Sequence, residues 1–201
     1  MSQSCGRLGM RARGQRGDQA GGPVPTDLDM TSEARTLYLL RHAAYEGDGH
    51  TTADHDRPLT AEGRRAAQRL ARFLRGVEPQ PVIIVCSTAL RARQTVDLLA
   101  SALGDVEVIF DAGLYEADAA DLLRRIQRVP AEATALMVVG HNPGLHVLAL
   151  ELTESAGGDD PRLAAFPAGA LACIAAPTGW SELCPGVAYL EWLVVPTELG
   201  T

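Results

Sequence analysis

Short apolar runs alternate along the chain with longer segments in which apolar residues recur at helical spacing. Several runs are continuously apolar, which is typical of strands that are buried on both faces of a sheet. We predict strands in the segments 37–40, 81–86, 106–110, 134–139, 169–176 and 187–195. We predict helices in the segments 60–74, 89–103, 119–128 and 145–152.

Polar residues at the helix starts support these boundaries. Thr60 and Asp118 stand where the first and third helices need an N-cap, and Ser87 or Thr88 can cap the second. The apolar positions of the first helix share one face, and its arginines fall largely off that face. We interpret these arginines as a solvated surface: Arg64, Arg65, Arg69, Arg72 and Arg75.

The alternation of strands and helices predicts the fold class. Strands separated by helical segments form βαβ units, which produce a mainly parallel sheet with helices on both faces. We therefore predict a three-layer α/β/α architecture. In such sheets, ligands bind beyond the carboxyl ends of the strands, so functional residues are expected there.

The first 34 residues differ from the rest of the chain. They are rich in Gly, Arg and Gln and lack an apolar period, so we expect residues 1–34 to be a disordered extension and residues 35–201 to form a single domain. Met30 precedes the first patterned segment, which leaves open a translation start there. A targeting peptide is the less favoured alternative.

Composition narrows the partners and the compartment. The net charge is −7 and the pI is about 5.2, which argues against a nucleic acid or an anionic membrane as the partner. The cysteines are scattered and form no C-x-x-C pair, so we expect reduced thiols in the cytoplasm and no metal site. They are Cys5, Cys86, Cys173 and Cys184.

Three predicted strands are followed by cationic or imidazole side chains. Arg41 and His42 end the first strand, Arg91 follows the second in the first turn of a helix, and His141 follows the fourth. The carboxyl ends of parallel strands lie at the same edge of a sheet, so we expect these four side chains to converge. Two guanidinium groups, imidazoles and free N–H groups at a helix start suit a phosphate dianion.

The segments that carry these residues resemble a known family. "LYLLRHA", "ADHDRPLT", "STALRARQT", "LYEA" and "VVGHNPG" resemble, in order and spacing, the histidine phosphatase superfamily. "DHDRPLT" and "FPAGALACI" are similar to its SixA-type phosphohistidine phosphatase branch rather than to the phosphoglycerate mutases. The resemblance extends from about Leu37 to Val195. It implies a phosphoglycerate mutase-like fold, and the segment 87–133 is too short for a large cap domain.

The resemblance implies a metal-independent phosphatase that needs no cofactor. His42 would be the nucleophile that becomes phosphohistidine, while Arg41, Arg91 and His141 would bind the phosphoryl oxygens. His42 must be neutral to attack, and the neighbouring cations should lower its pKa. The implied partner is a phosphorylated substrate, either phosphohistidine on a protein or a small phosphomonoester.

The acid that protonates the leaving group is less sharply indicated. Glu116 in "LYEA" matches the position at which the family commonly has an acid, and a solvated loop carboxylate is the alternative. The first motif continues as "RHAAY" where this branch more often has "RHAKS". Ala44 and Tyr45 therefore differ near the predicted pocket mouth, where they would affect substrate preference.

Two other functions remain open from sequence. A phosphoglycerate mutase-like phosphotransferase would need a lid that excludes water, and no segment suggests one. A non-catalytic module that binds phosphate or a phosphoprotein is the second alternative, although all four pocket residues are present.

Other polar residues have simpler interpretations. Arg93 is expected at the surface, and His146 is expected to be an ordinary helix residue. His50 and His55 have a spacing that could suggest a metal, but no third ligand is evident. We expect His55 and Asp56 to fix their loop to the helix that starts near Thr60, and Arg57 could border the pocket.

Overall fold

The structure is a computed structural model that describes residues 34–47, 53–154 and 161–200. The predicted disordered extension therefore lies, apart from Ala34, outside the described residues. Within the described residues, no helix is both long enough and apolar enough to cross a membrane.

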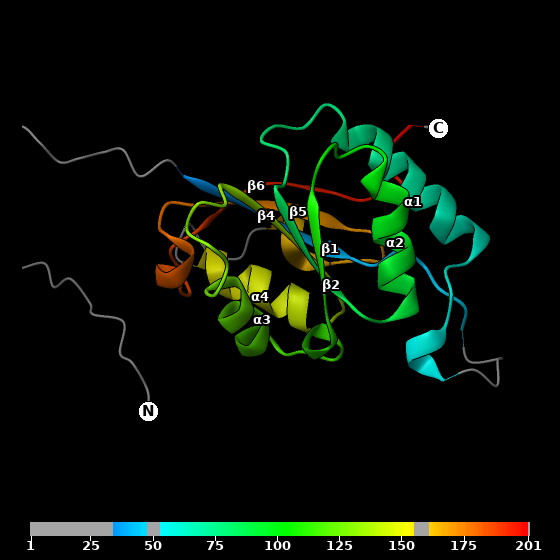
Figure 1. Cartoon of the computed structure of the whole chain (residues 1–201), viewed down its shortest axis with the longest axis horizontal. Coiled ribbons are helices and arrows are strands. Elements are labelled where there is room, and N and C mark those ends of the chain that lie inside the picture. Colours follow the sequence, from blue (N-terminus) through cyan, green and yellow to red (C-terminus); the bar gives the residue numbers. More distant parts are fainter. Residues whose placement is uncertain (1–33, 48–52, 155–160, 201) are drawn as a thin grey trace, which may run out of the picture.

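The core of the protein is a six-stranded sheet with the order β3-β2-β4-β1-β5-β6 (Figure 1). Strands β1 to β4 are mutually parallel, β5 is antiparallel to β1, and β6 is antiparallel to β5. The prediction of a mainly parallel sheet is confirmed. The strands are β1 Arg35–Arg41, β2 Ile83–Ser87, β3 Glu107–Asp111, β4 Ala135–Gly140, β5 Leu171–Ala176 and β6 Tyr189–Val194.

Helices cover both faces of this sheet, which confirms the three-layer prediction. Helices α1 and α2 pack together on one face, and α3 and α4 pack together on the other (Figure 1). Alternate residues of β1 serve the two layers: Leu37 and Leu39 join the core under α3 and α4, whereas Tyr38 and Leu40 join the core under α1 and α2. The helices are α1 Ala61–Leu74, α2 Leu90–Ala100, α3 Ala119–Ile126 and α4 Gly144–Thr153.

Two of the predicted helix caps are confirmed and one is wrong. The Thr60 hydroxyl accepts a hydrogen bond from the Gly63 N–H at 2.9 Å, and the Asp118 carboxylate caps α3 in the same way. Helix α2 begins after Ala89 without a side-chain cap. Ser87 cannot serve, because it is the last residue of β2, and the Thr88 hydroxyl instead contacts a histidine of the preceding loop.

The solvated face predicted for α1 is wrong at one position. The Arg69 side chain is only 15% exposed. Its Nε–H donates to the Pro196 carbonyl and its Nη2 pairs with Glu62, so the C-terminal segment packs across it. The other arginines of this face are exposed.

The strand order places the carboxyl ends of β1, β4 and β2 side by side. Strand β4 lies between the other two, so the residue that follows it sits between the residues that follow β1 and β2. The chain between β2 and β4 contains only α2, β3, α3 and the short 3-10 turn η2 at Ala112–Leu114. Among the described residues, no large cap domain covers this edge of the sheet, as predicted.

Candidate active site

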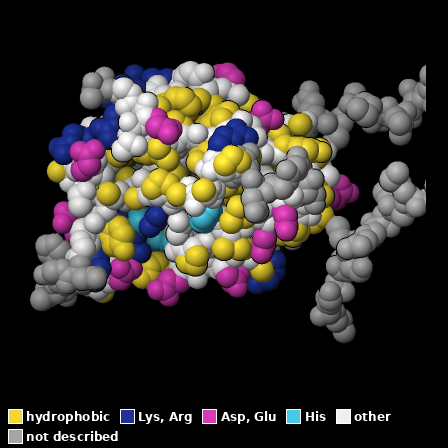
Figure 2. All heavy atoms as spheres, turned by 180° about the vertical axis from the view of Figure 1, so that it is seen from behind, with side chains coloured by type: hydrophobic (Ala, Val, Ile, Leu, Met, Phe, Trp, Pro, Cys, Tyr) yellow, Lys and Arg dark blue, Asp and Glu magenta, His cyan; other side chains and the backbone are white. Residues whose placement is uncertain are grey.

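A cleft of about 300 Å³ lies at the carboxyl edge of the parallel strands. All five residues predicted from sequence line it: Arg41, His42, Arg91, Glu116 and His141. Its other lining residues are Tyr45, Ala117, Asn142 and Pro143. Figure 2 shows histidine side chains beside a basic side chain in a hollow on one face of the molecule.

His42 is held in one tautomer by its own backbone. The side chain is 3% exposed, and its Nδ1 lies 2.8 Å from the Ala43 carbonyl oxygen. Because a carbonyl can only accept, Nδ1 carries the hydrogen and the Nε2 lone pair is left available. Nε2 accepts the Arg91 Nε–H at 3.3 Å. This places a neutral, potentially nucleophilic nitrogen at the cleft.

The pKa of His42 is lowered to about 4. Burial is the largest cause, and the charges of Arg91 and Arg41 act in the same direction, against the hydrogen bond to Ala43. The predicted direction of the pKa shift is confirmed. Burial contributes more to the shift than the neighbouring cations, which were the cause expected from the sequence. His42 is therefore neutral near pH 7.

The backbone around His42 is fixed on several sides. The His42 N–H donates to Gly140 of β4 at 3.1 Å, and the Ala43 N–H donates to the Thr95 hydroxyl at 3.1 Å. A Cβ on Gly63 would lie 1.9 Å from the Ala44 carbonyl oxygen, so only glycine permits α1 to approach this loop so closely. The position of His42 thus follows from β1, β4 and both helices of one layer.

Arg91 lies in the first turn of α2 and is 4% exposed. Its Nη1 donates to the Asp54 carbonyl at 2.6 Å, and its Nη2 pairs with the Asp54 carboxylate at 2.9 Å. Its guanidinium also lies over the Tyr45 ring, 4.4 Å from the centroid. The cation is therefore fixed beside His42.

His141 follows β4 and is 8% exposed. Its Nε2 lies 2.8 Å from the Ser87 hydroxyl, which already accepts the Ala89 N–H and so can donate to this nitrogen. Its ring centroid lies 5.0 Å from that of His42. The pKa of His141 is lowered to about 3, first by burial and then by His42 and Arg91. The Nδ1 atom is buried and has no hydrogen-bond partner among the described residues.

Arg41 approaches the cleft from the side of β5. Its Nη1 donates to the Phe166 carbonyl at 3.0 Å, and the Asn142 amide donates to the same oxygen at 2.8 Å. Burial lowers the pKa of Arg41, but an arginine remains a cation at neutral pH. The cleft is therefore lined by two guanidinium groups and two imidazoles.

Glu116 lies at the rim of the cleft and is exposed. Its φ is 55°, a left-handed conformation that is uncommon for a residue with a side chain. The start of α4 supports this loop closely, since a Cβ on Gly144 would lie 2.1 Å from the Ala117 carbonyl oxygen. Glu116 therefore combines an uncommon backbone conformation with a position at the cleft.

Residues assigned to simpler roles lie outside the cleft lining. Arg93 is exposed, with its guanidinium 5.0 Å from the Phe110 ring centroid. His146 contacts the Leu163 carbonyl at 2.7 Å. Arg57 does not line the cleft but lies 3.5 Å from the Asp54 carboxylate.

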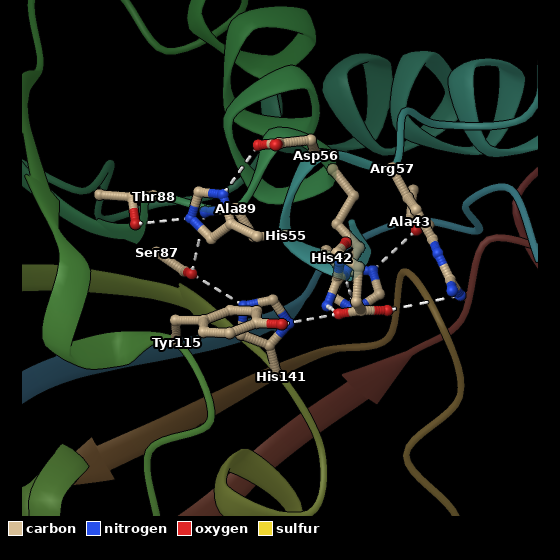
Figure 3. A network of polar contacts seen from close by, with 12 residues as sticks. His42, Ala43, His55, Asp56, Arg57, Ser87, Thr88, Ala89, Tyr115 and His141 are labelled. Atoms are coloured by element: carbon tan, nitrogen blue, oxygen red, sulfur yellow. Dashed lines mark hydrogen bonds and ion pairs between the residues drawn. The ribbon is translucent and has the colours of Figure 1, made fainter. Parts of the chain in front are cut away.

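The loop that contains His55 is attached to a different element than predicted. His55 contacts Asp56 through Nδ1 and the Thr88 hydroxyl through Nε2, each at 3.0 Å (Figure 3). The loop is thereby tied to the start of α2 rather than to α1, because the chain folds back over the end of β2. His50 lies outside the described residues. Among the described residues, no three His, Cys, Asp or Glu side chains are grouped to hold a metal ion.

The sequence interpretation missed several polar residues that shape the cleft. Asp54 and Tyr115 contact each other at 2.8 Å beside Arg91, Ser87 contacts His141, and Asn142 lines the cleft. Asp54 lies in "ADHDRPLT", a segment that the resemblance had already singled out. The place of Asp54 in that segment was the available sequence signal.

Comparison with known proteins identifies the family. The model of the histidine phosphatase superfamily (branch 1) matches residues 37–155. The chain belongs to this superfamily. An uncharacterized protein of Mycobacterium tuberculosis is 38% identical over 164 residues, which cover 78% of this chain and 99% of that protein.

Solved structures of histidine phosphatases share the fold. A structure from Nakamurella multipartitia, described as a "putative phosphohistidine phosphatase SixA", is 34% identical with a TM-score of 0.72 and covers 81% of this chain and 96% of its own. The protein histidine phosphatase SixA complexed with tungstate has a TM-score of 0.68 at 23% identity, covers 82% of this chain and 99% of its own, and supports the fold alone. The family match and the 34% identical structure support a SixA-like phosphatase.

Proposed function

We propose that this histidine phosphatase is a metal-independent phosphohydrolase that works through a phosphohistidine at His42. The observation that carries the proposal is the tautomer of His42: Nδ1–H donates to the Ala43 carbonyl, so Nε2 carries the lone pair, in a cleft with two guanidinium groups. A neutral imidazole with one nitrogen fixed in this way is a competent nucleophile.

In the proposed first step, His42 Nε2 attacks phosphorus. A new N–P bond forms while the bond from phosphorus to the leaving group breaks, and the leaving group takes the bonding pair. In the second step, water attacks the phosphohistidine, inorganic phosphate is released, and Nε2 regains its lone pair. The proton of the water replaces the one that the leaving group gained.

The charge of the transferring group would be stabilised by fixed donors. Arg41 and Arg91 supply the positive charge, and His141 can offer Nδ1–H when the Ser87 hydroxyl donates to its Nε2. Phosphoryl transfer depends mainly on positioning and electrostatic stabilisation. These groups supply the charge that a metal ion would otherwise provide, which is why we propose a metal-independent reaction.

We propose Glu116 as the acid that protonates the leaving group. It lines the cleft, and its backbone has a left-handed conformation of the kind that occurs more often at functional sites. Its exposure leaves the solvated-carboxylate interpretation open, and the nitrogen of a phosphoramidate needs little acid assistance.

We propose phosphohistidine on a protein as the substrate class, with small phosphomonoesters as the alternative. The described residues form no cap domain above the cleft, so a bulky protein can approach, and a 34% identical structure is described as a putative phosphohistidine phosphatase. The acidic net charge of −7 disfavours nucleic acid. An open site also disfavours the phosphotransferase alternative, which requires exclusion of water.

We propose that residues 35–201 act as a single phosphatase domain in the cytoplasm. The support is the single sheet that spans the described residues and the thiols of Cys86 and Cys173, which are free and buried.

The direct test is hydrolysis of a phosphohistidine-carrying protein and of p-nitrophenyl phosphate in the presence of EDTA. We expect the wild type to release inorganic phosphate and His42→Ala to be inactive. If the wild type binds phosphate but turns over neither substrate, the binding-module alternative is correct. Transfer to an added acceptor in preference to water would support the phosphotransferase.

A further inference from the structure

Asp54 makes an unusually complete contact with the guanidinium of Arg91. It is the first residue of the 3-10 turn η1, Asp54–Asp56. Its backbone carbonyl accepts from Nη1 at 2.6 Å, and its carboxylate Oδ2 accepts from Nη2 at 2.9 Å. One residue therefore fixes both terminal nitrogens of the cation, through its main chain and its side chain together.

This contact determines which edge of Arg91 meets the reacting nitrogen. With Nη1 and Nη2 engaged by Asp54, Nε–H is the donor directed at His42 Nε2. A substrate phosphoryl group must take over that donor before Nε2 can attack. Because Arg91 is already held by Asp54, the takeover requires a change of one hydrogen bond rather than a reorganisation of the whole side chain.

The same carboxylate oxygen also contacts the loop that contains Glu116. The Tyr115 hydroxyl donates to Asp54 Oδ2 at 2.8 Å, and Tyr115 immediately precedes Glu116. Figure 3 shows the tyrosine hydroxyl pointing at a carboxylate that is also joined to Arg57. Asp54 thus connects the start of α2 with the strained loop at the rim.

The Asp54 carboxylate is negatively charged, so it cannot itself attract a phosphate anion. Burial alone would raise the pKa of Asp54, but hydrogen bonds from Tyr115 and Arg91 outweigh it and hold the pKa below its usual value. A carboxylate beside a phosphate site repels the anion. Loss of Asp54 should therefore impair the orientation of Arg91 without weakening the attraction of the cleft for phosphate.

We infer that Asp54 is a positioning residue, which holds Arg91 in the orientation for phosphoryl transfer and ties it to the loop of Glu116. The inference rests on the proposed function, since it assigns a role within that reaction. Asp54 acts through Arg91 and is not itself a catalytic residue. The predicted signature is a loss in kcat that is not accompanied by a loss in phosphate affinity.

The kinetic test compares the wild type with Asp54→Ala, Asp54→Asn, Arg91→Ala and the Asp54→Ala/Arg91→Ala double variant. Asp56→Ala is the matched control, because Asp56 lies on the same turn, is 67% exposed and contacts His55. For each protein, kcat and KM are measured on p-nitrophenyl phosphate, and inorganic phosphate is titrated as an inhibitor. Circular dichroism and thermal unfolding establish that each variant is folded.

We expect Asp54→Ala to lower kcat by roughly 10- to 100-fold, with an inhibition constant for phosphate that is unchanged or lower. Both variants keep the main-chain contact, but Asp54→Asn also retains a side-chain oxygen that can accept a hydrogen bond, so it should lose less. Asp56→Ala should match the wild type. The double variant should be no slower than Arg91→Ala, since Asp54 acts through that residue. A kcat for Asp54→Ala near the wild-type value, parallel loss of phosphate affinity, or independent effects in the double variant would each overturn the inference.

A second readout does not depend on turnover. The Nε–H resonance of Arg91, assigned by its absence in Arg91→Lys, should be protected from solvent exchange in the wild type and in Asp56→Ala. Asp54→Ala should lose that protection. If the wild type has no phosphatase activity, the proposed function fails while this resonance still tests Asp54. Undiminished protection in Asp54→Ala would refute the positioning role whatever the activity.

Discussion

The two sides of the cleft hold their arginines in different ways. On the Asp54 side, formed by Asp54, Arg91 and Tyr115, the guanidinium meets a carboxylate and a carbonyl. On the Phe166 side, formed by Arg41, Asn142 and Phe166, the guanidinium donates to one carbonyl among the described residues, and the Asn142 amide shares that carbonyl. Protein contacts therefore fix the Arg91 guanidinium, whereas the Arg41 guanidinium keeps more of its donors available to a phosphoryl group.

The elements that build each side explain this difference. The Asp54 side joins the loop after β1 to the start of α2. The Phe166 side comes from the segment that leads into the antiparallel strand β5, where the Gly169 N–H donates to the Arg41 and His42 carbonyls. That segment meets the site mainly through its main chain. Arg41 Nε is buried and has no hydrogen-bond partner within the described ranges.

The largest expected effect tests the two arginines against each other. Arg91→Ala should lower kcat by roughly 1000-fold, because it removes a preorganised donor next to the nucleophile. Arg41→Ala should lower kcat/KM by roughly 100-fold, with a larger share of the loss in KM. Steady-state kinetics on p-nitrophenyl phosphate measures both. Equal losses with the same division between kcat and KM would remove the distinction between the two sides.

The lowered pKa values of the two histidines in the cleft should move the acid limb of the pH profile of kcat/KM to lower pH. With pKa values of about 4 for His42 and about 3 for His141, both imidazoles are neutral at pH 5. Activity should therefore persist to about pH 5 and fall roughly tenfold per pH unit below pH 4, as His42 becomes protonated. A pH profile of kcat/KM checks this, and an acid limb centred near pH 6.5 would contradict the burial argument.

The same lowered pKa values predict how stability depends on pH. An unfolded histidine binds a proton near pH 6.5, whereas these two remain neutral in the folded protein until about pH 4 and pH 3. The unfolded state thus binds more protons as the pH falls, and the free energy of unfolding should decrease from about pH 6.5 downward. Urea unfolding of the wild type and His141→Gln should show a shallower decrease for the variant. Identical pH dependences would show that His141 does not contribute.

Single hydrogen bonds on each side should have smaller effects. Tyr115→Phe removes one bond to Asp54 and should lower kcat about 2- to 10-fold, with little change in KM. Asn142→Ala leaves the Phe166 carbonyl to Arg41 alone and should raise KM by a similar factor. Kinetics on the same substrate decides between these outcomes. If Tyr115→Phe changed KM and Asn142→Ala changed kcat, the roles of the two sides would be reversed.

The smallest expected effect lies outside both sides. Thr60→Ala removes the N-cap of α1 and should lower the free energy of unfolding by about 1 kcal/mol. Its activity below the melting temperature should equal that of the wild type, because Thr60 does not line the cleft. Denaturant unfolding and kinetics together check this. A clear loss of kcat in a folded Thr60→Ala protein would mean that the α1 boundary also positions the site.

The sequence predicted most of the fold because its signals were local. Continuous apolar runs and the caps at Thr60 and Asp118 identify strands and helices within a few residues. The parallel topology then brings Arg41, His42 and His141 to one edge without further information. The four residues named from the strand ends do line one cleft.

The remaining details depend on contacts between distant segments. Asp54 and Arg91 are 37 residues apart, and nothing local says that their side chains meet. Two other features also depend on distant segments. The C-terminal segment packs over Arg69, and burial is the largest cause of the lowered pKa of His42. Each requires knowledge of how tertiary structure excludes water from a particular side chain.

The central claim is that His42 Nε2 accepts the phosphoryl group. The most direct measurement is mass spectrometry of the protein, quenched at neutral to alkaline pH during turnover of a phosphorylated donor. We expect an acid-labile phosphate on His42 that is absent in His42→Ala. Turnover by the wild type with the phosphate on another residue, or undiminished turnover by His42→Ala, would contradict it.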